Sequence, residues 1–233
     1  MSGDRARILG AIRTALARDA LPETTVATLG RRLKQPRVNV VPARGRVAAA
    51  DLVETFVTEA ELVNTTTARL AGVAEVPAAV VTYLRAANMA QAVRVTTDPL
   101  MQTVPWANEP LLRVTYGAAA NDDGTSVTTA LAGVAETGTL ILASSGETPT
   151  SLNFLPEVHI VLLPTDRIVG AYEDAWQRLR GQFGSGVMPR VVNWITGPSR
   201  TADIEQTLLL GAHGPKRLHI LLIDGNEAPA QPA

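Results

Sequence analysis

Several short segments in the second half of the chain are almost entirely apolar, without the polar alternation that marks a strand with one exposed face. The clearest are VHIVLLP at 158–164 and RLHILLID at 217–224. VTTALAGVA, TGTLILASS and RVVNWIT are further β-prone segments, and residues 170–180 and 202–210 have helical patterns. Strands buried on both faces need helices to cover them. The pattern therefore predicts an α/β fold with a mainly parallel sheet and helices on both faces.

The segment before this region has the same character. Residues 48–60 have the spacing of an amphipathic helix, and NTTTARLAGV can supply a short strand. Pro77 stands where a first-turn helix proline is tolerated, AAVVTYLRAANM continues the helix, and AVRVTT follows as a strand. The order is strand, helix, strand, as a parallel sheet requires.

The N-terminal region forms an arm that precedes the main domain. Ile8, Leu9, Ile12 and Leu16 fall at helical spacing with arginines between them, which predicts an amphipathic helix. Three prolines then predict an irregular linker or strap: Pro22, Pro36 and Pro42. We expect an arm at 1–46, an α/β domain at 47–226 and a disordered tail at 227–233. The helix either packs on its own domain or forms an oligomer or partner contact.

The composition excludes several kinds of function. A net charge of -1 and a pI near 6.3 give no attraction to nucleic acid. The chain has no cysteine, so it cannot hold an iron-sulfur cluster, a thiolate zinc site or a thiol nucleophile. Its three histidines lie in different elements without a metal-binding spacing, and His159 and His219 are interpreted as core residues. We expect no bound metal and no cofactor.

The sequence also indicates where the protein works. Asp4, Arg5, Arg7 and Arg13 interrupt the apolar residues of the N-terminus, which is unlike a signal peptide. No segment reaches the roughly 18 apolar residues of a membrane span. We expect a cytoplasmic protein without an integral membrane segment.

The loop Gly197-Pro198-Ser199-Arg200-Thr201 lies between an expected strand and an expected helix. In that arrangement it stands at the carboxyl edge of the sheet, where open α/β sheets bind ligands. Free N–H groups of Gly197, Ser199 and Thr201, helped by Arg200, would bind a carboxylate or phosphate. The alternative is that Ser199 or Thr201 only caps the helix and Arg200 pairs with a nearby acid.

A helix over 202–210 would separate this loop from the turn that contains His213. Ten helical residues rise about 15 Å, which would carry His213 to the opposite edge of the sheet. We therefore expect that His213 and Arg200 do not share a site. His213 is then a residue at a helix C-terminus or part of a separate contact.

Glu136 is the one carboxylate in the β-prone run GVAETGTLILASSGE before its final residue. If the strands bury it, Glu136 is suited to general acid/base work or to nucleophilic catalysis, and it is the candidate catalytic residue. The alternative is a tight turn, Ala135-Glu136-Thr137-Gly138, that leaves the carboxylate solvated and inert.

Small polar residues follow the apolar TLIL of the same run. Ser144, Ser145 and Gly146 can offer hydroxyl and backbone donors at the edge of a ligand cleft.

Longer motifs resemble a known family. At AETGTLIL, LPEVHIVLLP, ITGPSRTADIEQ, GAHGPKRLHILLID and RARILGAIRTAL the chain resembles the LUD-domain family, in particular its LutC/YkgG group of lactate utilization proteins. The resemblance spans nearly the whole chain and is densest at 127–224. It implies a Rossmann-like α/β/α sheet similar to the NagB, ribose-phosphate isomerase and CoA-transferase superfamily.

The resemblance also implies a role in a system that oxidises L-lactate to pyruvate alongside iron-sulfur partner proteins. Without cysteine this chain cannot be the cluster-bearing member. The same resemblance favours Ser199, Arg200 and Thr201 as a ligand site. Two alternatives stay open: a free-standing isomerase- or CoA-transferase-like enzyme on a sugar phosphate or acyl-CoA, and a scaffold whose cleft is vestigial. A homo-oligomer is compatible with each.

Overall fold

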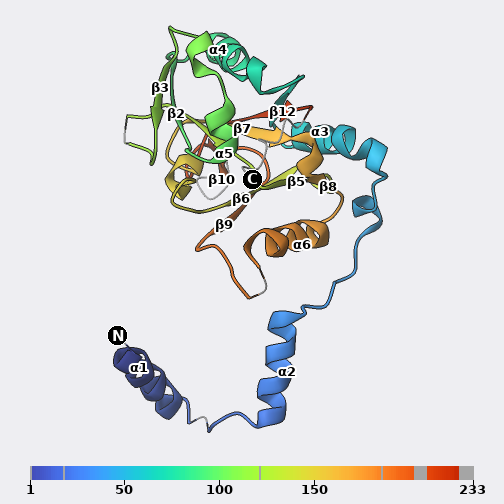
Figure 1. Cartoon of the computed structure of the whole chain (residues 1–233), viewed down its shortest axis with the longest axis vertical. Coiled ribbons are helices and arrows are strands. Elements are labelled where there is room, and N and C mark those ends of the chain that lie inside the picture. The colour runs from blue at the N-terminus through green and yellow to red at the C-terminus, as the bar shows by residue number, and fades with distance from the viewer. Residues whose placement is uncertain (1, 18, 121, 185, 202–208, 226–233) are drawn as a thin grey trace, which may run out of the picture. The chain divides into compact units, whose positions relative to one another are not determined.

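The chain divides by its internal contacts into two compact units, residues 1–39 and 40–233. The computed structural model describes residues 2–17, 19–120, 122–184, 186–201 and 209–225 (Figure 1). The expected tail at 227–233 therefore lies outside the described residues.

The first unit contains two helices, α1 (Ser2–Ala15) and α2 (Glu23–Lys34). The helix expected in the first twenty residues is α1. The prolines predict an irregular stretch after it, and the structure instead has α2, because Pro22 directly precedes this helix and residues 23–34 contain no proline. The large apolar side chains of both helices are exposed: Ile8, Leu9, Ile12, Val26, Leu29 and Leu33.

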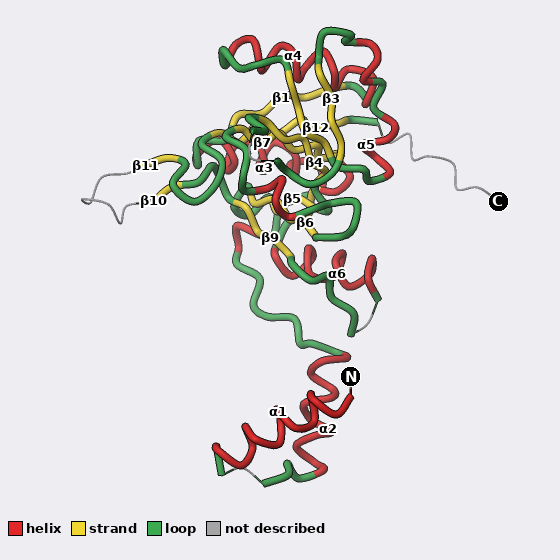
Figure 2. The backbone as a smooth tube through the Cα atoms, turned by 90° about the vertical axis from the view of Figure 1, so that its left-hand side faces the viewer, coloured by secondary structure: helices red, strands yellow, loops and turns green. Residues whose placement is uncertain are grey.

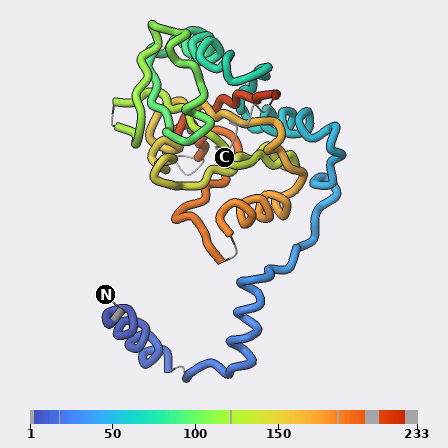
Figure 3. Tube along the Cα trace, viewed as in Figure 1, coloured from blue at the N-terminus to red at the C-terminus, as the bar shows by residue number. Residues whose placement is uncertain are grey.

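The core of the second unit is a six-stranded sheet with the order β1-β12-β7-β4-β2-β3. All of its pairings among the described residues are parallel. The strands are β1 (Thr66–Leu70), β2 (Ala92–Val95), β3 (Arg113–Tyr116), β4 (Thr125–Thr129), β7 (Val158–Pro164) and β12 (Arg217–Ile223). In Figure 3 the last strand, in red, lies among earlier segments of this unit, as its pairing with β1 and β7 requires.

Helices lie on both faces of this sheet, as the sequence predicts. The helices of the second unit are α3 (Leu52–Leu62), α4 (Val76–Ala86), α5 (Pro99–Thr103) and α6 (Tyr172–Phe183). Short 3-10 helices are found at Ala43–Gly45, Ala49–Asp51, Val73–Glu75, Trp106–Asn108, Thr150–Asn153 and Thr165–Arg167.

Alternate residues of β7 face different helices. Ile160 and Leu162 belong to the apolar cluster that includes α4, whereas Val161 and Leu163 belong to the cluster that includes Phe56 of α3. All seven residues of β7 are buried. This two-sided burial explains why the strand has no polar alternation in its sequence.

A second, four-stranded sheet has the order β8-β5-β6-β9. Its strands are β5 (Ala132–Val134), β6 (Thr139–Ala143), β8 (Ile168–Val169) and β9 (Val192–Ile195). Pairing is antiparallel between β5 and β6 and between β6 and β9, and parallel between β5 and β8. Helix α6 covers this sheet through Ala175 and Leu179.

The position of β9 corrects one prediction. RVVNWIT is a strand as expected, but it pairs antiparallel with β6 and is not part of the parallel sheet. The reason is its aromatic packing: the ring of Trp194 lies 5.3 Å from that of Tyr172 and 4.9 Å from that of Trp176, both on α6. These contacts hold β9 under α6 and away from the helices of the parallel sheet.

Substitution of Gly138 tests how tightly the β5–β6 hairpin packs on α3. It has φ +62, and a Cβ at this position would lie 2.6 Å from Cα of Ala60. We expect Gly138→Ala to lower the free energy of unfolding by more than about 2 kcal/mol, because alanine strains the backbone and forces the hairpin off the helix. Urea unfolding followed by circular dichroism measures the change.

Gly181→Ala is the matched control. Gly181 lies in α6 and a Cβ there would meet nothing within 4 Å. This substitution should stabilise by about 0.5–1 kcal/mol through helix propensity. Equal stability of the two variants would contradict the close approach of the hairpin to α3.

Candidate functional site

A cavity of about 370 Å³ lies at the amino ends of β7 and β12. His159 and Leu218, the second residues of these two strands, are part of its wall. Two loops close it, one formed by the end of β9 and the residues that follow it (194–200) and the other by residues 213–215 before β12. Asn153 and Phe154 complete the lining.

Backbone hydrogen bonds hold the two loops together. The N–H of Ser199 donates to the carbonyl of Pro215 at 2.9 Å, and the N–H of Gly211 donates to the carbonyl of Ser199 at 2.9 Å. Ser199 Oγ accepts a hydrogen bond from the N–H of His213 at 3.3 Å. Ser199 is thus a structural link between the loops, with its side chain already occupied by a backbone donor.

Gly197 allows the first loop to turn into the cavity. It has φ +74, and a Cβ there would lie 2.5 Å from the carbonyl oxygen of Val63. Only glycine combines this backbone conformation with so close an approach.

The chain then continues as a short ladder: β10 (Arg200–Thr201) pairs antiparallel with β11 (Leu209–Leu210). Figure 2 shows the two strands side by side, projecting from the sheets of the second unit. The prediction of a helix over 202–210 is wrong at residues 209–210, which are extended, and residues 202–208 lie outside the described part of the chain. The antiparallel pairing of β10 with β11 brings residues 200–201 and 209–210 side by side.

Two expectations about the loop are corrected as a result. It stands at the amino edge of the parallel sheet and not at the carboxyl edge, because β9 runs in the second sheet. His213 is not carried away from Arg200: both line the same cavity. Of the expected ligand residues, Gly197, Ser199 and Arg200 line this cavity, whereas Thr201 is buried within β10.

The charge of the cavity favours an anion. Arg200 is exposed and lines the wall, and no aspartate or glutamate is among the described residues of the lining. No ion pair of Arg200 with a carboxylate is found in the part of the chain that the structure describes. A guanidinium without a carboxylate partner can form a bidentate bond with a ligand carboxylate.

His159 forms the buried wall of the cavity as an uncharged side chain. It is 1% exposed, and burial lowers its pKa to about 3. Its Nε2 lies 2.7 Å from Oγ1 of Thr128.

His219 on β12 is a similar buried histidine, although it does not line the cavity. Burial lowers its pKa to about 4. Its Nδ1 lies 2.8 Å from Oγ1 of Thr66, and its ring stacks on that of Tyr83. Both histidines are core residues, as the sequence predicts.

A chain of hydroxyl groups, which the sequence does not reveal, starts at the cavity. Oγ1 of Thr196 lies 2.6 Å from Oγ1 of Thr139, which lies 2.9 Å from the hydroxyl of Tyr172. That hydroxyl lies 2.8 Å from Oγ1 of Thr137. The threonines of the AETGT motif therefore join the β5–β6 hairpin to the loop after β9. Adjacent Thr-Gly pairs at 137–138 and 196–197 are the only sequence signal of this contact.

Glu136 occupies the turn Ala135-Glu136-Thr137-Gly138, so the predicted tight turn is confirmed. The solvated alternative is wrong, because Glu136 is 5% exposed. Its Oε1 accepts a hydrogen bond from Nε of Arg44 at 3.1 Å. Glu136 is not part of the cavity lining, so the structure separates the candidate catalytic carboxylate from the candidate anion site.

The serines after β6 stabilise a local turn. Ser144 Oγ accepts from the N–H of Val191 at 2.9 Å, and Ser145 Oγ accepts from the N–H groups of Glu147 and Thr148 at 3.1 Å each. Ser145 lines a different cavity, and neither Ser144 nor Gly146 lines the one that contains Arg200. The expected site residues thus fall into three separate places.

Among the described residues, no group of three or more histidine, aspartate or glutamate side chains is arranged to hold a metal ion. None of the helices in the described ranges has the length and apolar character needed to span a bilayer.

The fold and the cavity define a three-layer α/β protein with an anion-suited cavity at the amino edge of its parallel sheet. The sequence profile of the LUD domain matches residues 32–223. The chain therefore belongs to the LUD-domain family, as its motifs predict.

Relatives agree with this assignment, and a solved structure shares the fold. Lactate utilization protein C of Shouchella clausii is 36% identical, that of Bacillus subtilis is 41% identical, and an uncharacterized protein of Neisseria meningitidis serogroup B is 44% identical. Each alignment covers 39% of this chain and 38–40% of the relative, so the chain matches about two-fifths of the length of these relatives. A DUF162 family protein from Deinococcus radiodurans has the same fold: the TM-score is 0.58 at 20% identity, over 76% of this chain and 99% of that one.

The buried histidines predict a specific acid sensitivity. The unfolded chain protonates His159 and His219 near pH 6.5, whereas the folded protein does so only near pH 3 and pH 4. Stability is therefore lost as the pH falls below 6.5. Between pH 7 and pH 5 each histidine should lower the free energy of unfolding by about 2 kcal/mol.

Replacing His159 or His219 with glutamine should remove about half of this pH dependence. Urea unfolding at pH 7 and pH 5 measures it. Unfolding at pH 7 and pH 8.5 is the control, because each histidine should change the free energy of unfolding by only about 0.2 kcal/mol there. If one of these variants keeps the full wild-type change in the free energy of unfolding between pH 7 and pH 5, the histidine that it lacks is not a buried, neutral residue in solution.

Proposed function

We propose that this chain acts in L-lactate utilization as the non-iron-sulfur member of a lactate-oxidising system, and that its cavity at the amino ends of β7 and β12 binds a small carboxylate. The observation that carries the proposal is the lining of this cavity, where Arg200 is present and no described carboxylate opposes it. The relatives named Lactate utilization protein C supply the context. Lactate and pyruvate are carboxylates of the size that such a site accepts.

The environment of Arg200 supports recognition of a flat carboxylate. Trp194, Gly197 and Pro198 line the same cavity as Arg200, and the buried His159 forms another part of its wall. A wall that combines apolar and polar residues around one charged group can orient a small ligand by its charged end. His159 stays neutral, so it adds a hydrogen-bonding surface without repelling or attracting the anion by charge.

The iron-sulfur proteins of the system would carry the electrons, because this chain has no cysteine to hold a cluster. Within such a system the chain would bind the carboxylate or present it to a partner in the cytoplasm. Glu136 is a less direct candidate for catalysis, since its carboxylate is engaged by Arg44 and is not part of the cavity lining.

A second candidate function is assembly. The exposed apolar side chains of α1 and α2 favour it, because such faces are usually covered by another surface. Pull-downs of the iron-sulfur partners with and without residues 1–39 separate the two functions. Equal recovery of the partners would eliminate the assembly function and leave the carboxylate site untouched.

Titration calorimetry with L-lactate and pyruvate tests the carboxylate site. Arg200→Gln should weaken binding by about 10- to 100-fold, the equivalent of about 1.5–3 kcal/mol for a charge-assisted hydrogen bond. Arg200→Lys should also weaken it, because lysine keeps the charge and loses the planar fork. Arg190→Gln is the matched control: Arg190 is exposed and does not line this cavity.

Growth on L-lactate tests the role in the cell. Deletion of the gene should abolish growth on L-lactate as the carbon source, in a strain without a paralogue. The wild-type gene and the Arg190→Gln variant should restore growth, and Arg200→Gln should not. Normal growth of the deletion strain would refute the proposed function, and full rescue by Arg200→Gln would refute the proposed site alone.

A further inference from the structure

A second cavity, of about 500 Å³, lies at the opposite edge of the parallel sheet. Its walls come from the segments that follow three parallel strands: Asp98–Leu100 after β2, Ala130 and Leu131 after β4, and Arg167 after β7. Arg178 and Phe183 of α6 close one side. The carboxyl edge of a parallel sheet is the usual place for a ligand in α/β proteins.

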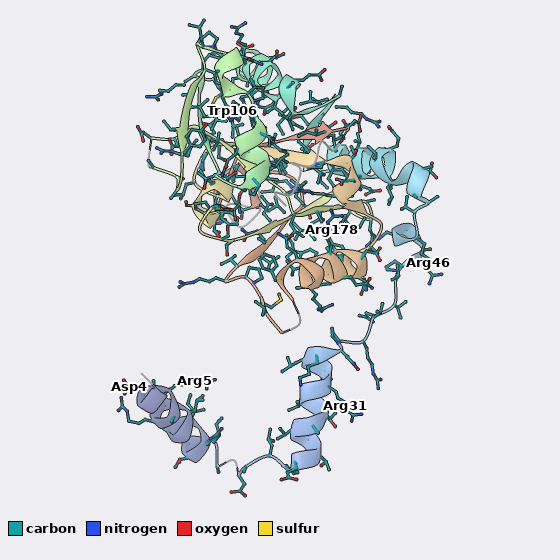
Figure 4. All side chains as sticks on the ribbon, in the orientation of Figure 1. Asp4, Arg5, Arg31, Arg46, Trp106 and Arg178 are labelled. Carbon is teal, nitrogen blue, oxygen red and sulfur yellow. The ribbon has the colours of Figure 1, made fainter. Side chains whose placement is uncertain are left out.

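Two guanidinium groups line this cavity, and each is held by a neutral acceptor. Nη1 of Arg167 donates to the carbonyl of Ala130 at 2.9 Å, and Nη1 of Arg178 donates to the carbonyl of Asp166 at 3.1 Å. Figure 4 labels Arg178 on α6, at the side of that helix that faces the sheets. Neither arginine forms an ion pair with a carboxylate of the described residues.

The charge of Arg178 acts on Arg167. Burial lowers the pKa of the Arg167 guanidinium, and the neighbouring charge of Arg178 lowers it further. Like charges in a half-buried wall are unfavourable unless an anion compensates them.

Nearby carboxylates supply only part of that compensation: the charges of Asp166 and Asp98 raise the pKa of Arg167, but burial and Arg178 outweigh them. Oδ1 of Asp98 accepts from the N–H of Met101 at 3.3 Å and Oδ2 accepts from Oγ1 of Thr96 at 2.5 Å, so Asp98 serves as the N-cap of α5. Glu147 is exposed. Neither carboxylate forms an ion pair with the two arginines among the described residues.

An unsatisfied hydroxyl stands in the same wall. Oγ1 of Thr129, the last residue of β4, is buried and has no hydrogen-bond partner. A buried hydroxyl without a partner is costly, and a ligand oxygen in this cavity would supply one. Together Thr129, Arg167 and Arg178 offer one hydroxyl and two guanidinium forks to the same space.

We propose that this cavity binds the phosphate group of a small phosphorylated molecule or free phosphate, through Arg167, Arg178 and Thr129. A phosphate group carries close to two negative charges and several acceptor oxygens, which match two guanidinium groups and a hydroxyl better than the single charge of a carboxylate does. The volume leaves room for an organic part beyond the phosphate. The site is independent of the lactate role proposed above.

Thermal-shift and calorimetric titrations with inorganic phosphate and with glycerol 3-phosphate test the proposal, with glycerol as the uncharged control. Both phosphates should raise the melting temperature of the wild-type protein, and glycerol should not. Tighter binding of glycerol 3-phosphate than of phosphate would identify an ester as the ligand, and equal binding would identify free phosphate. Absence of binding of both at millimolar concentration would overturn the proposal.

Variants locate the site. Arg178→Gln should weaken phosphate binding at least tenfold, and Thr129→Val should weaken it severalfold. Without ligand the melting temperature should change little, because the first variant removes a like charge along with one hydrogen bond and the second removes an unsatisfied hydroxyl. Arg180→Gln is the matched control: it lies on the same helix, over the ring of Trp176, and does not line the cavity.

Arg200→Gln distinguishes this site from the first cavity. Phosphate binding should be unchanged in that variant. If Arg200→Gln abolishes phosphate binding while Arg178→Gln preserves it, the phosphate occupies the first cavity and the inference is wrong.

Discussion

The two-sided burial of β7 and β12 is the constraint on which the rest of this structure depends. The two strands pair in parallel over seven residues, and α3 and α4 press on opposite faces. Side chains fill both faces, so no ligand can reach the middle of the sheet. Space for a ligand remains only where the strands end. The two cavities lie at these two ends, one beside His159 at the start of β7 and one beside Arg167 just after its last residue.

The same burial decides which polar groups the core can hold. His159 and His219 are accepted on β7 and β12 because each is neutral and has a threonine hydroxyl as a partner from a neighbouring strand. The charged Arg167 lies beyond the carboxyl end of β7, where water or a ligand can reach it. The neutral His159 in the wall of the first cavity and the two guanidinium groups of the second are therefore two results of one rule.

Short sequence patterns predict the strands and turns that depend on neighbouring residues in the chain. The apolar runs at 158–164 and 217–224 gave the buried parallel strands, and the Thr-Gly pair at 137–138 gave the tight turn. Pairing partners distant in sequence were not predictable in this way. The direction of β9 depends on Trp194 meeting α6, and the burial of Glu136 depends on Arg44, 92 residues away. The site at Arg200 was placed at the wrong edge for this reason, although Gly197, Ser199 and Arg200 do line one cavity.

The length of β7 limits what the two sites can do together. Seven strand residues span about 20 Å, so ligands in the two cavities would be separated by roughly that distance, through packed core. Direct transfer of a group between them within one chain is impossible at this range. A phosphate in the second cavity could therefore affect a carboxylate in the first only through the strands that reach both, chiefly β7 with its partner β12. The alternative is that the two ligands take part in separate reaction steps. A partner protein would then have to bind at whichever edge of the parallel sheet holds the ligand that reacts.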